Sequence, residues 1–242
     1  MKKNLCFVLV FFISILSIHA QYEEKMSKEN VVKGTILKNG GKTEGYIKMT
    51  GIIHDGKRWG SAPWEFQGEI KFIPKDVFEK NEKIKNSFFE KYTPKDCDGY
   101  LYDTLVYESV KYQDLTAVGM NMLPKKVFMH RVVEGKVCLF DYFDTPSPVL
   151  AGDIPAIYEG YRKVMTIYRV GVEGKLKSIN NLNIEKELAD CPIVVEKNAK
   201  GEYKIVGSDE NSSGFTKLLG SVIGRENMKV IALLDYNKNC GK

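Results

Sequence analysis

Two histidines are the first residues to consider for chemistry, because an imidazole gains and loses a proton near neutral pH. Beyond residue 20 the chain contains only His54 and His130. His54 precedes Asp55 in a glycine-flanked loop, and His130 lies in a predicted strand. A hydrolase could use either one with a nearby carboxylate, but no Gly-x-Ser-x-Gly signature marks a nucleophile. We therefore favour a solvated loop residue and an ordinary strand residue, and we assign no catalytic residue.

Two glycine-containing motifs resemble cofactor sites but lack part of the required pattern. Gly40-Gly41-Lys42-Thr43 ends like a phosphate-binding loop, yet the first glycine of such a loop would fall at Ile36, and a strand is predicted where a helix should follow. Asp96-Cys97-Asp98-Gly99 with Asp103 resembles a calcium loop that has only some of its oxygen ligands. We predict a hairpin turn at the first motif, no metal, and no cofactor.

Aromatic residues offer a second kind of chemistry, which is ligand binding by stacking. Trp64 and Phe66 lie two residues apart, so in a strand they would share one face and could stack against a sugar or a partner. Aromatic residues at this spacing more often fill a core. The candidate binding residues, all weak, are His54, Asp55, Trp59 and Trp64.

Four cysteines follow residue 20, namely Cys97, Cys138, Cys191 and Cys240. An even number in an exported protein favours disulfides, and the absence of a Cys-x-x-Cys pair argues against a zinc site. Four cysteines allow three pairings, between which spacing does not choose. Four separate buried thiols are the alternative.

The first 20 residues have the pattern of a secretory signal peptide cleaved after Ala20. Lys2 and Lys3 precede an apolar run over residues 5–18, and charged residues begin just after Ala20. The run is shorter than the roughly 20 residues that span a bilayer, so we predict no membrane anchor. Position 21 is Gln rather than Cys, so we predict no lipid attachment there.

Cleavage would leave 222 of the 242 residues and lower the net charge from +5 to +3, because Lys2 and Lys3 are removed. This length is enough for one large domain or two small ones. Basic and acidic residues are interspersed, so the composition argues against a nucleic-acid partner. No later apolar stretch is long enough to span a membrane.

Hydrophobic alternation and turn residues predict antiparallel strands over the first half of the chain. Asn39-Gly40-Gly41 predicts the tight turn of one hairpin, and Glu134-Gly135 predicts that of another. Residues 78–89 show only a weak helical pattern. The predicted strands are 31–37 with 43–49, 64–66 with 70–73, 100–107, and 127–133 with 136–143.

Prolines mark residues 146–155 as a connection, and the pattern changes beyond it. Residues 164–170 are the last predicted strand. Helices are predicted over 184–189 (capped by Asn183), 215–223 and 227–236, whereas 193–206 fit a helix or a hairpin. The predicted fold class is α+β, with hairpins and a curled sheet over 21–145 and a mixed region over 156–242 that ends mainly in α-helices.

Short segments spread over most of the chain resemble an uncharacterised family of exported proteins from Gram-negative bacteria. They are Gly34, 45–47, 70–77, Phe128, 133–137, Cys191-Pro192 and 236–240. The resemblance carries no established activity. It favours pairing Cys191 with Cys240, a bridge that would also tie the last helix to an earlier one. Cys97 and Cys138 then remain as a candidate second pair.

We expect an exported protein that is periplasmic, envelope-associated or secreted. Its most favoured role is a non-catalytic binding or scaffolding protein of the cell envelope, with another envelope protein or a glycan as partner. A secreted or periplasmic hydrolase that uses His54 or His130 is the alternative. An inhibitor or immunity-type protein also fits the size and the export signal.

Overall fold

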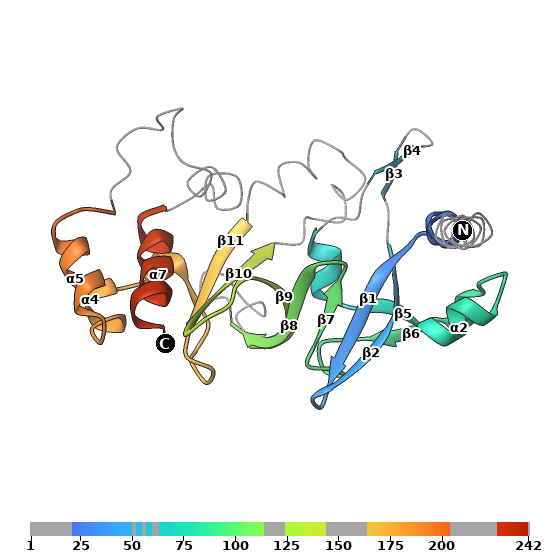
Figure 1. Ribbon diagram of the computed structural model, residues 1–242, viewed down its shortest axis with the longest axis horizontal. Coiled ribbons are helices and arrows are strands. Elements are labelled where there is room, and N and C mark those ends of the chain that lie inside the picture. Colours follow the sequence, from blue (N-terminus) through green and yellow to red (C-terminus); the bar gives the residue numbers. More distant parts are fainter. Residues whose placement is uncertain are drawn as a thin grey trace, which may run out of the picture. The chain divides into compact units, whose positions relative to one another are not determined.

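The computed structural model describes residues 21–49, 52–54, 57–59, 63–113, 124–143, 164–203 and 227–241. Its contacts divide the chain into two compact units, Met1–Leu105 and Val106–Lys242, which we call the N-terminal and C-terminal units. Figure 1 traces the chain from blue to red. The predicted signal peptide, the connection at 146–155 and the helix at 215–223 lie outside the described residues.

The N-terminal unit contains one antiparallel sheet in the order β7-β1-β2-β5-β6 and a separate pair, β3-β4. Residues 21–29 are helical and precede the first strand. The strands are β1 (Val31–Lys38), β2 (Gly41–Lys48), β3 (Ile52–His54), β4 (Lys57–Trp59), β5 (Ile70–Pro74), β6 (Glu90–Tyr92) and β7 (Gly99–Tyr102). The short helices are η1 (Pro63–Gln67), α2 (Lys75–Lys80) and η2 (Asn86–Phe88).

The first predicted hairpin is confirmed. β1 pairs with β2 from Val31↔Lys48 to Lys38↔Gly41. Asn39 and Gly40 form the turn with φ angles of 52° and 75°, as a two-residue turn between twisted strands requires. Lys42 and Thr43 therefore lie in β2, and their motif is part of a hairpin.

Two strand predictions in this unit are wrong. Residues 64–66 belong to the 3₁₀ helix η1, which starts at Pro63 and buries Trp64 and Phe66. The predicted strand at 100–107 is two strands, β7 and β8, because Asp103 adopts φ 53° and turns the chain. Aspartate tolerates this left-handed conformation better than most residues.

The C-terminal unit is built on five antiparallel strands in the order β12-β11-β10-β9-β8. They are β8 (Leu105–Tyr112), β9 (Lys125–Val133), β10 (Val137–Phe143), β11 (Val164–Val170) and β12 (Lys177–Ser178). The helices are η5 (Ile179–Asn181), α4 (Ile184–Glu187), α5 (Pro192–Ala199) and α7 (Asn227–Cys240). In Figure 1, α7 lies beside the strands with α4 and α5 on its far side.

The prediction of an α+β fold with a mainly α-helical C-terminal part is wrong. The described chain is mostly antiparallel β, with a few short helices that lie mainly in the C-terminal unit. Helices do form at 184–187 and 227–240, but the strands predicted at 127–143 and 164–170 belong to the same unit as these helices. The C-terminal unit is therefore not mainly helical. A helix with one apolar face needs a surface to cover, and here that surface is the sheet.

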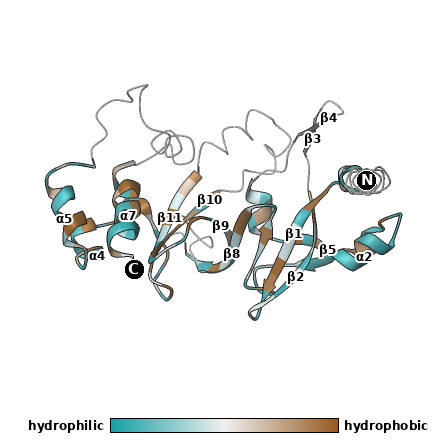
Figure 2. Ribbon diagram, viewed as in Figure 1, coloured by the Kyte–Doolittle hydropathy of each residue, from teal (hydrophilic) through white to brown (hydrophobic). Residues whose placement is uncertain are grey.

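The predicted helices at 184–189 and 227–236 are confirmed, and the undecided segment 193–206 begins in a helix. Asn183 caps α4 by accepting a hydrogen bond from the Lys186 N–H at 3.0 Å. Residues 192–199 form the helix α5, in which Pro192 occupies the first turn, where its missing N–H costs nothing. Figure 2 shows hydrophobic segments on α7 and on the strands next to it.

Two glycines pair directly in the N-terminal sheet, Gly34 on β1 with Gly45 on β2. A Cβ on Gly34 would lie 2.6 Å from Ile47 Cδ1. A Cβ on Gly45 would contact the Ile73 carbonyl oxygen and lie 2.5 Å from the Phe72 ring. Ile47, Phe72 and Ile73 are fully buried. The absence of side chains at the two glycines therefore provides space that the large core side chains occupy.

We expect Gly45→Ala to lower the free energy of unfolding by about 2–3 kcal/mol, as overpacking of a dense core does. Gly68→Ala is the matched control, because a Cβ there meets nothing within 4 Å. Urea denaturation of both variants checks this. Equal stability of the two variants would contradict the packing argument.

Candidate functional site

The predicted aromatic binding surface is not supported at Trp64. Its side chain is buried, as is that of Phe66, whose ring lies 4.5 Å from the Tyr102 ring. The Tyr100 hydroxyl donates a hydrogen bond to the Phe66 carbonyl at 2.6 Å. His54 and Trp59 lie in the β3-β4 pair, where only the backbone is described, and Asp55 lies outside the described residues.

His130 lies in a row of residues that crosses the C-terminal sheet. Tyr107, His130, Asp141 and Thr166 are successive partners on β8, β9, β10 and β11. The His130 Nδ1 atom lies 3.8 Å from Asp141 Oδ2, beyond hydrogen-bond length, and the two side chains are 22% and 12% exposed. The Tyr107 ring packs 5.5 Å from the imidazole. The structure thus brings one predicted histidine next to a carboxylate.

The calcium-like motif has its carboxylates committed to turns. Asp96 accepts hydrogen bonds from the backbone N–H and the hydroxyl of Thr93, at 2.7 and 2.6 Å. Asp98 accepts from the Asn39 N–H at 2.6 Å. Across the described residues, no group of three or more His, Cys, Asp or Glu side chains is placed to hold a metal ion.

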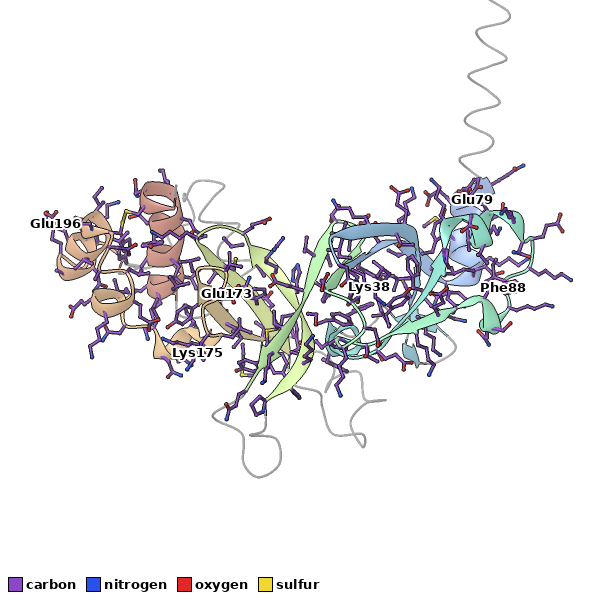
Figure 3. All side chains as sticks on the ribbon, turned by 90° about the horizontal axis from the view of Figure 1, so that it is seen from below. Lys38, Glu79, Phe88, Glu173, Lys175 and Glu196 are labelled. Carbon is purple, nitrogen blue, oxygen red and sulfur yellow. A yellow bond between two sulfur atoms is a disulfide. The ribbon has the colours of Figure 1, made fainter. Side chains whose placement is uncertain are left out.

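Cys191 and Cys240 form a disulfide with Cα atoms 5.8 Å apart. The bridge joins the start of α5 to the end of α7, as the resemblance predicted, and Figure 3 shows it in yellow. Cys97 and Cys138 are buried free thiols, one in each unit. Burial raises the pKa of the Cys97 thiol.

Asn237 on α7 fastens the helix to the sheet. Its side-chain carbonyl accepts from the Val137 N–H at 2.8 Å, and its amide donates to the Val137 carbonyl at 2.7 Å. The side chain thereby replaces a neighbouring strand at the start of β10. Gly135 makes room for this contact, because a Cβ there would lie 2.7 Å from the Asn237 amide.

A charged cluster lies beside this contact. Lys136 Nζ pairs with Asp190 Oδ2 at 2.8 Å, and the Tyr236 hydroxyl donates to the same oxygen at 2.8 Å. The hydrogen bond from Lys136 holds the pKa of Asp190 below its usual value, and Asp190 raises the pKa of Lys136. Segments 133–137, Cys191-Pro192 and 236–240, which carried the resemblance, therefore meet at one structural junction.

Glu108 on β8 binds arginines from two other strands of the same sheet. Its carboxylate lies 2.6 Å from Arg169 of β11 and 3.3 Å from Arg131 of β9. Strands β9 and β10 separate β8 from β11, so in a flat sheet the two strands would be about 14 Å apart. Because side chains stand roughly perpendicular to a sheet, the Glu108–Arg169 contact requires this sheet to curl.

We call the face that carries Glu108 the inner face and the opposite one the outer face. The inner face also carries a buried apolar cluster, which comprises Val110, Tyr112, Val127, Met129, Cys138, Phe140, Tyr142 and Ile167. The outer face packs against the helices through Val137, Leu139 and Tyr168. The curled sheet therefore has two cores, one inside the curl and one beneath the helices.

Arg169 lies at one end of the inner face. Its guanidinium carbon lies 5.2 Å from the centre of the Phe140 ring. Burial lowers the pKa of Arg169, but the hydrogen bond and charge of Glu108 outweigh this, so the pKa is raised overall. Its Nε atom is buried and has no hydrogen-bond partner among the described residues. A buried unsatisfied donor costs about 1–3 kcal/mol.

A pocket of about 580 Å³ opens at Arg169, and we call it the mouth pocket. β8 and β11 both contribute lining residues, and the turn after β11 contributes the residues that we call the rim. Glu173 and Lys175 of this rim are labelled in Figure 3. The lining comprises Ser109, Val110, Lys111, Gln113, Pro124, Arg169, Val172, Glu173, Gly174, Lys175 and Leu176.

The sequence analysis overlooked Glu108, Arg169 and the mouth pocket. A signal was present, because Glu108 lies between Val106 and Val110 at alternate positions of β8, and Arg169 follows Ile167 in the same way on β11. A charged residue on the apolar side of an alternating strand must find a partner within the fold. The curl that supplies the partner was not readable from either strand alone.

Comparisons with protein-family models, curated proteins and solved structures find no match to this chain. Within the described ranges, no helix combines the length and the apolar run that would span a membrane. The resemblance to exported Gram-negative proteins remains a prediction.

We expect two of the four cysteines after residue 20 to react when the oxidised protein is denatured without reductant, and all four after reduction. Reduction should lower the free energy of unfolding by about 4 kcal/mol in the chain-entropy model, because the bridge spans 49 residues. Thiol titration and denaturation with and without reductant check both points. Four reactive thiols before reduction would contradict the bridge.

We expect Asn237→Ala to lower the free energy of unfolding by about 2 kcal/mol, because the Val137 N–H and carbonyl would both lose their partner. Asn239→Ala is the matched control, since that side chain is exposed and bonds only to Asp235 of its own helix. Thermal denaturation monitored by circular dichroism checks the difference. Equal stability of the two variants would show that Asn237 does not hold the helix to the sheet.

Proposed function

We propose that this chain is an exported, non-catalytic binding protein of the cell envelope, with the mouth pocket as its ligand site. The observation that carries the proposal is the pocket itself, held between β8 and β11 by the Glu108–Arg169 ion pair. Mouths of curled or closed β-sheets are recurrent ligand sites, because rigid strands hold the lining in place. The volume of about 580 Å³ suits a small molecule or a protruding part of a larger partner.

Export rests on the signal-like first 20 residues, and the disulfide agrees with an oxidising compartment. Envelope proteins and glycans remain the broad classes of partner. The C-terminal unit suits a binding role, because the disulfide and Asn237 stiffen the outer side of the sheet that lines the pocket.

A hydrolase is the second candidate, favoured by the His130–Asp141 pair alone. In an acid–histidine–hydroxyl relay, the histidine lies between the acid and the nucleophile. Here Thr166, the hydroxyl of the same row, pairs with Asp141 on the side away from His130. This order weighs against a relay through Thr166.

Equilibrium dialysis of the full mature chain against chitotetraose, octanoate and inorganic phosphate, followed by chromatography of the recovered probe, separates the two candidates. We expect saturable binding of at least one probe and its recovery intact. Gln113→Trp should weaken binding about tenfold by filling the pocket, as the loss of a few contacts does. Lys238→Trp, on the exposed part of α7, and His130→Ala should leave binding unchanged.

Two results would overturn the binding proposal. One is a cleaved probe whose turnover is lost in His130→Ala, which would identify a hydrolase. The other is the absence of saturable binding for all three probes.

A further inference from the structure

The lining of the mouth pocket is predominantly basic. Arg169, Lys111 and Lys175 face a single acid, Glu173. Arg169 is already paired with Glu108. The side chains of Lys111 and Lys175 form no ion pair or hydrogen bond with any described residue, so the two ammonium groups remain available to an anion.

Arg169 is the third basic residue of the lining. Its Nε–H is a buried donor without a partner among the described residues, and it belongs to a side chain that lines the pocket. Buried donors are almost always satisfied in folded proteins. Because Nε is shielded from solvent and Nη1 binds Glu108, Arg169 contributes its positive charge to the lining rather than a free donor.

Four further lining residues have aliphatic side chains, whereas Ser109 and Gln113 are polar. Val110, Pro124, Val172 and Leu176 line the pocket, and Leu176 packs against the buried cluster of the inner face. Val172, at the rim, is 82% exposed. The described lining contains no aromatic ring, the platform on which sugars usually stack. An aliphatic ligand therefore suits these walls better than a carbohydrate.

We propose that the mouth pocket binds an amphipathic carboxylate, with its charged head between Lys111 and Lys175 and its aliphatic part against Val110 and Leu176. This inference rests on the proposed function and adds the class of ligand to it. The anion is held by charge and the tail by burial, so each part alone should bind more weakly than the whole.

Calorimetric titration of the mature chain with octanoate, octanol, acetate and glucuronate tests the ligand class. We expect octanoate to bind at least about tenfold more tightly than octanol, which lacks the charge, or acetate, which lacks the tail. Glucuronate, an acidic sugar, should bind no better than acetate. Raising the salt concentration should weaken octanoate binding and leave octanol binding unchanged.

The double variant Lys111→Gln with Lys175→Gln should weaken octanoate binding about tenfold, since two solvent-accessible ionic contacts are removed. Lys186→Gln with Lys238→Gln is the matched control, because it removes the same charge from exposed lysines on α4 and α7. The control should bind octanoate like the parent protein. Circular dichroism confirms that both double variants remain folded.

Different failures would reject different proposals. If octanol or glucuronate binds as tightly as octanoate, or if both double variants bind octanoate equally well, the amphipathic carboxylate is wrong. In those cases a loss of binding in Gln113→Trp would still support a mouth-site binding protein. If Gln113→Trp also has no effect on the bound probe, the pocket is not the site and both proposals fall.

Discussion

The C-terminal unit depends on one carboxylate that holds two cations from different strands. Glu108 contacts Arg131 on the adjacent strand and Arg169 three strands away. The first contact links neighbouring strands, and the second requires the sheet to curl. Removing Glu108 would leave two partly buried guanidinium groups without this shared anion, which costs more than the pair itself contributes. The inner apolar cluster and the mouth pocket both follow from this curvature.

The outer face is stabilised by different interactions. There, α7 is fastened by the Asn237–Val137 hydrogen bonds, by the disulfide at Cys240 and by the Lys136–Asp190–Tyr236 cluster. These groups contact one another, so their role is to hold α7 against the sheet. The side chains of Lys111 and Lys175, which have no partner among the described residues, line the mouth pocket instead.

The hairpins were predictable because their signals are local. Asn39-Gly40 needs no distant contact to favour its turn, and Glu134-Gly135 marks the end of β9 in the same way. Asn183 caps α4 through a residue three positions away. Trp64–Phe66 and residues 100–107 were misread, because Pro63 and Asp103 redirect the backbone while the aromatic pattern still resembles a strand. The helical tendency of the C-terminal part was overstated, since the sheet beneath the helices is formed by segments read separately.

The sequence by itself determined the export-type start, the turns, most strands and helices, and the even set of cysteines. The resemblance chose Cys191 and Cys240 as partners, and the structure joins them. Only the tertiary structure decided that Glu108 meets Arg169, because that contact spans 61 positions and exists only when four strands pair and curl. It likewise decided that His130, which lies beside Asp141 on the outer face, is not part of the pocket lining. Local patterns specify elements, whereas a ligand site requires side chains that distant strands bring together.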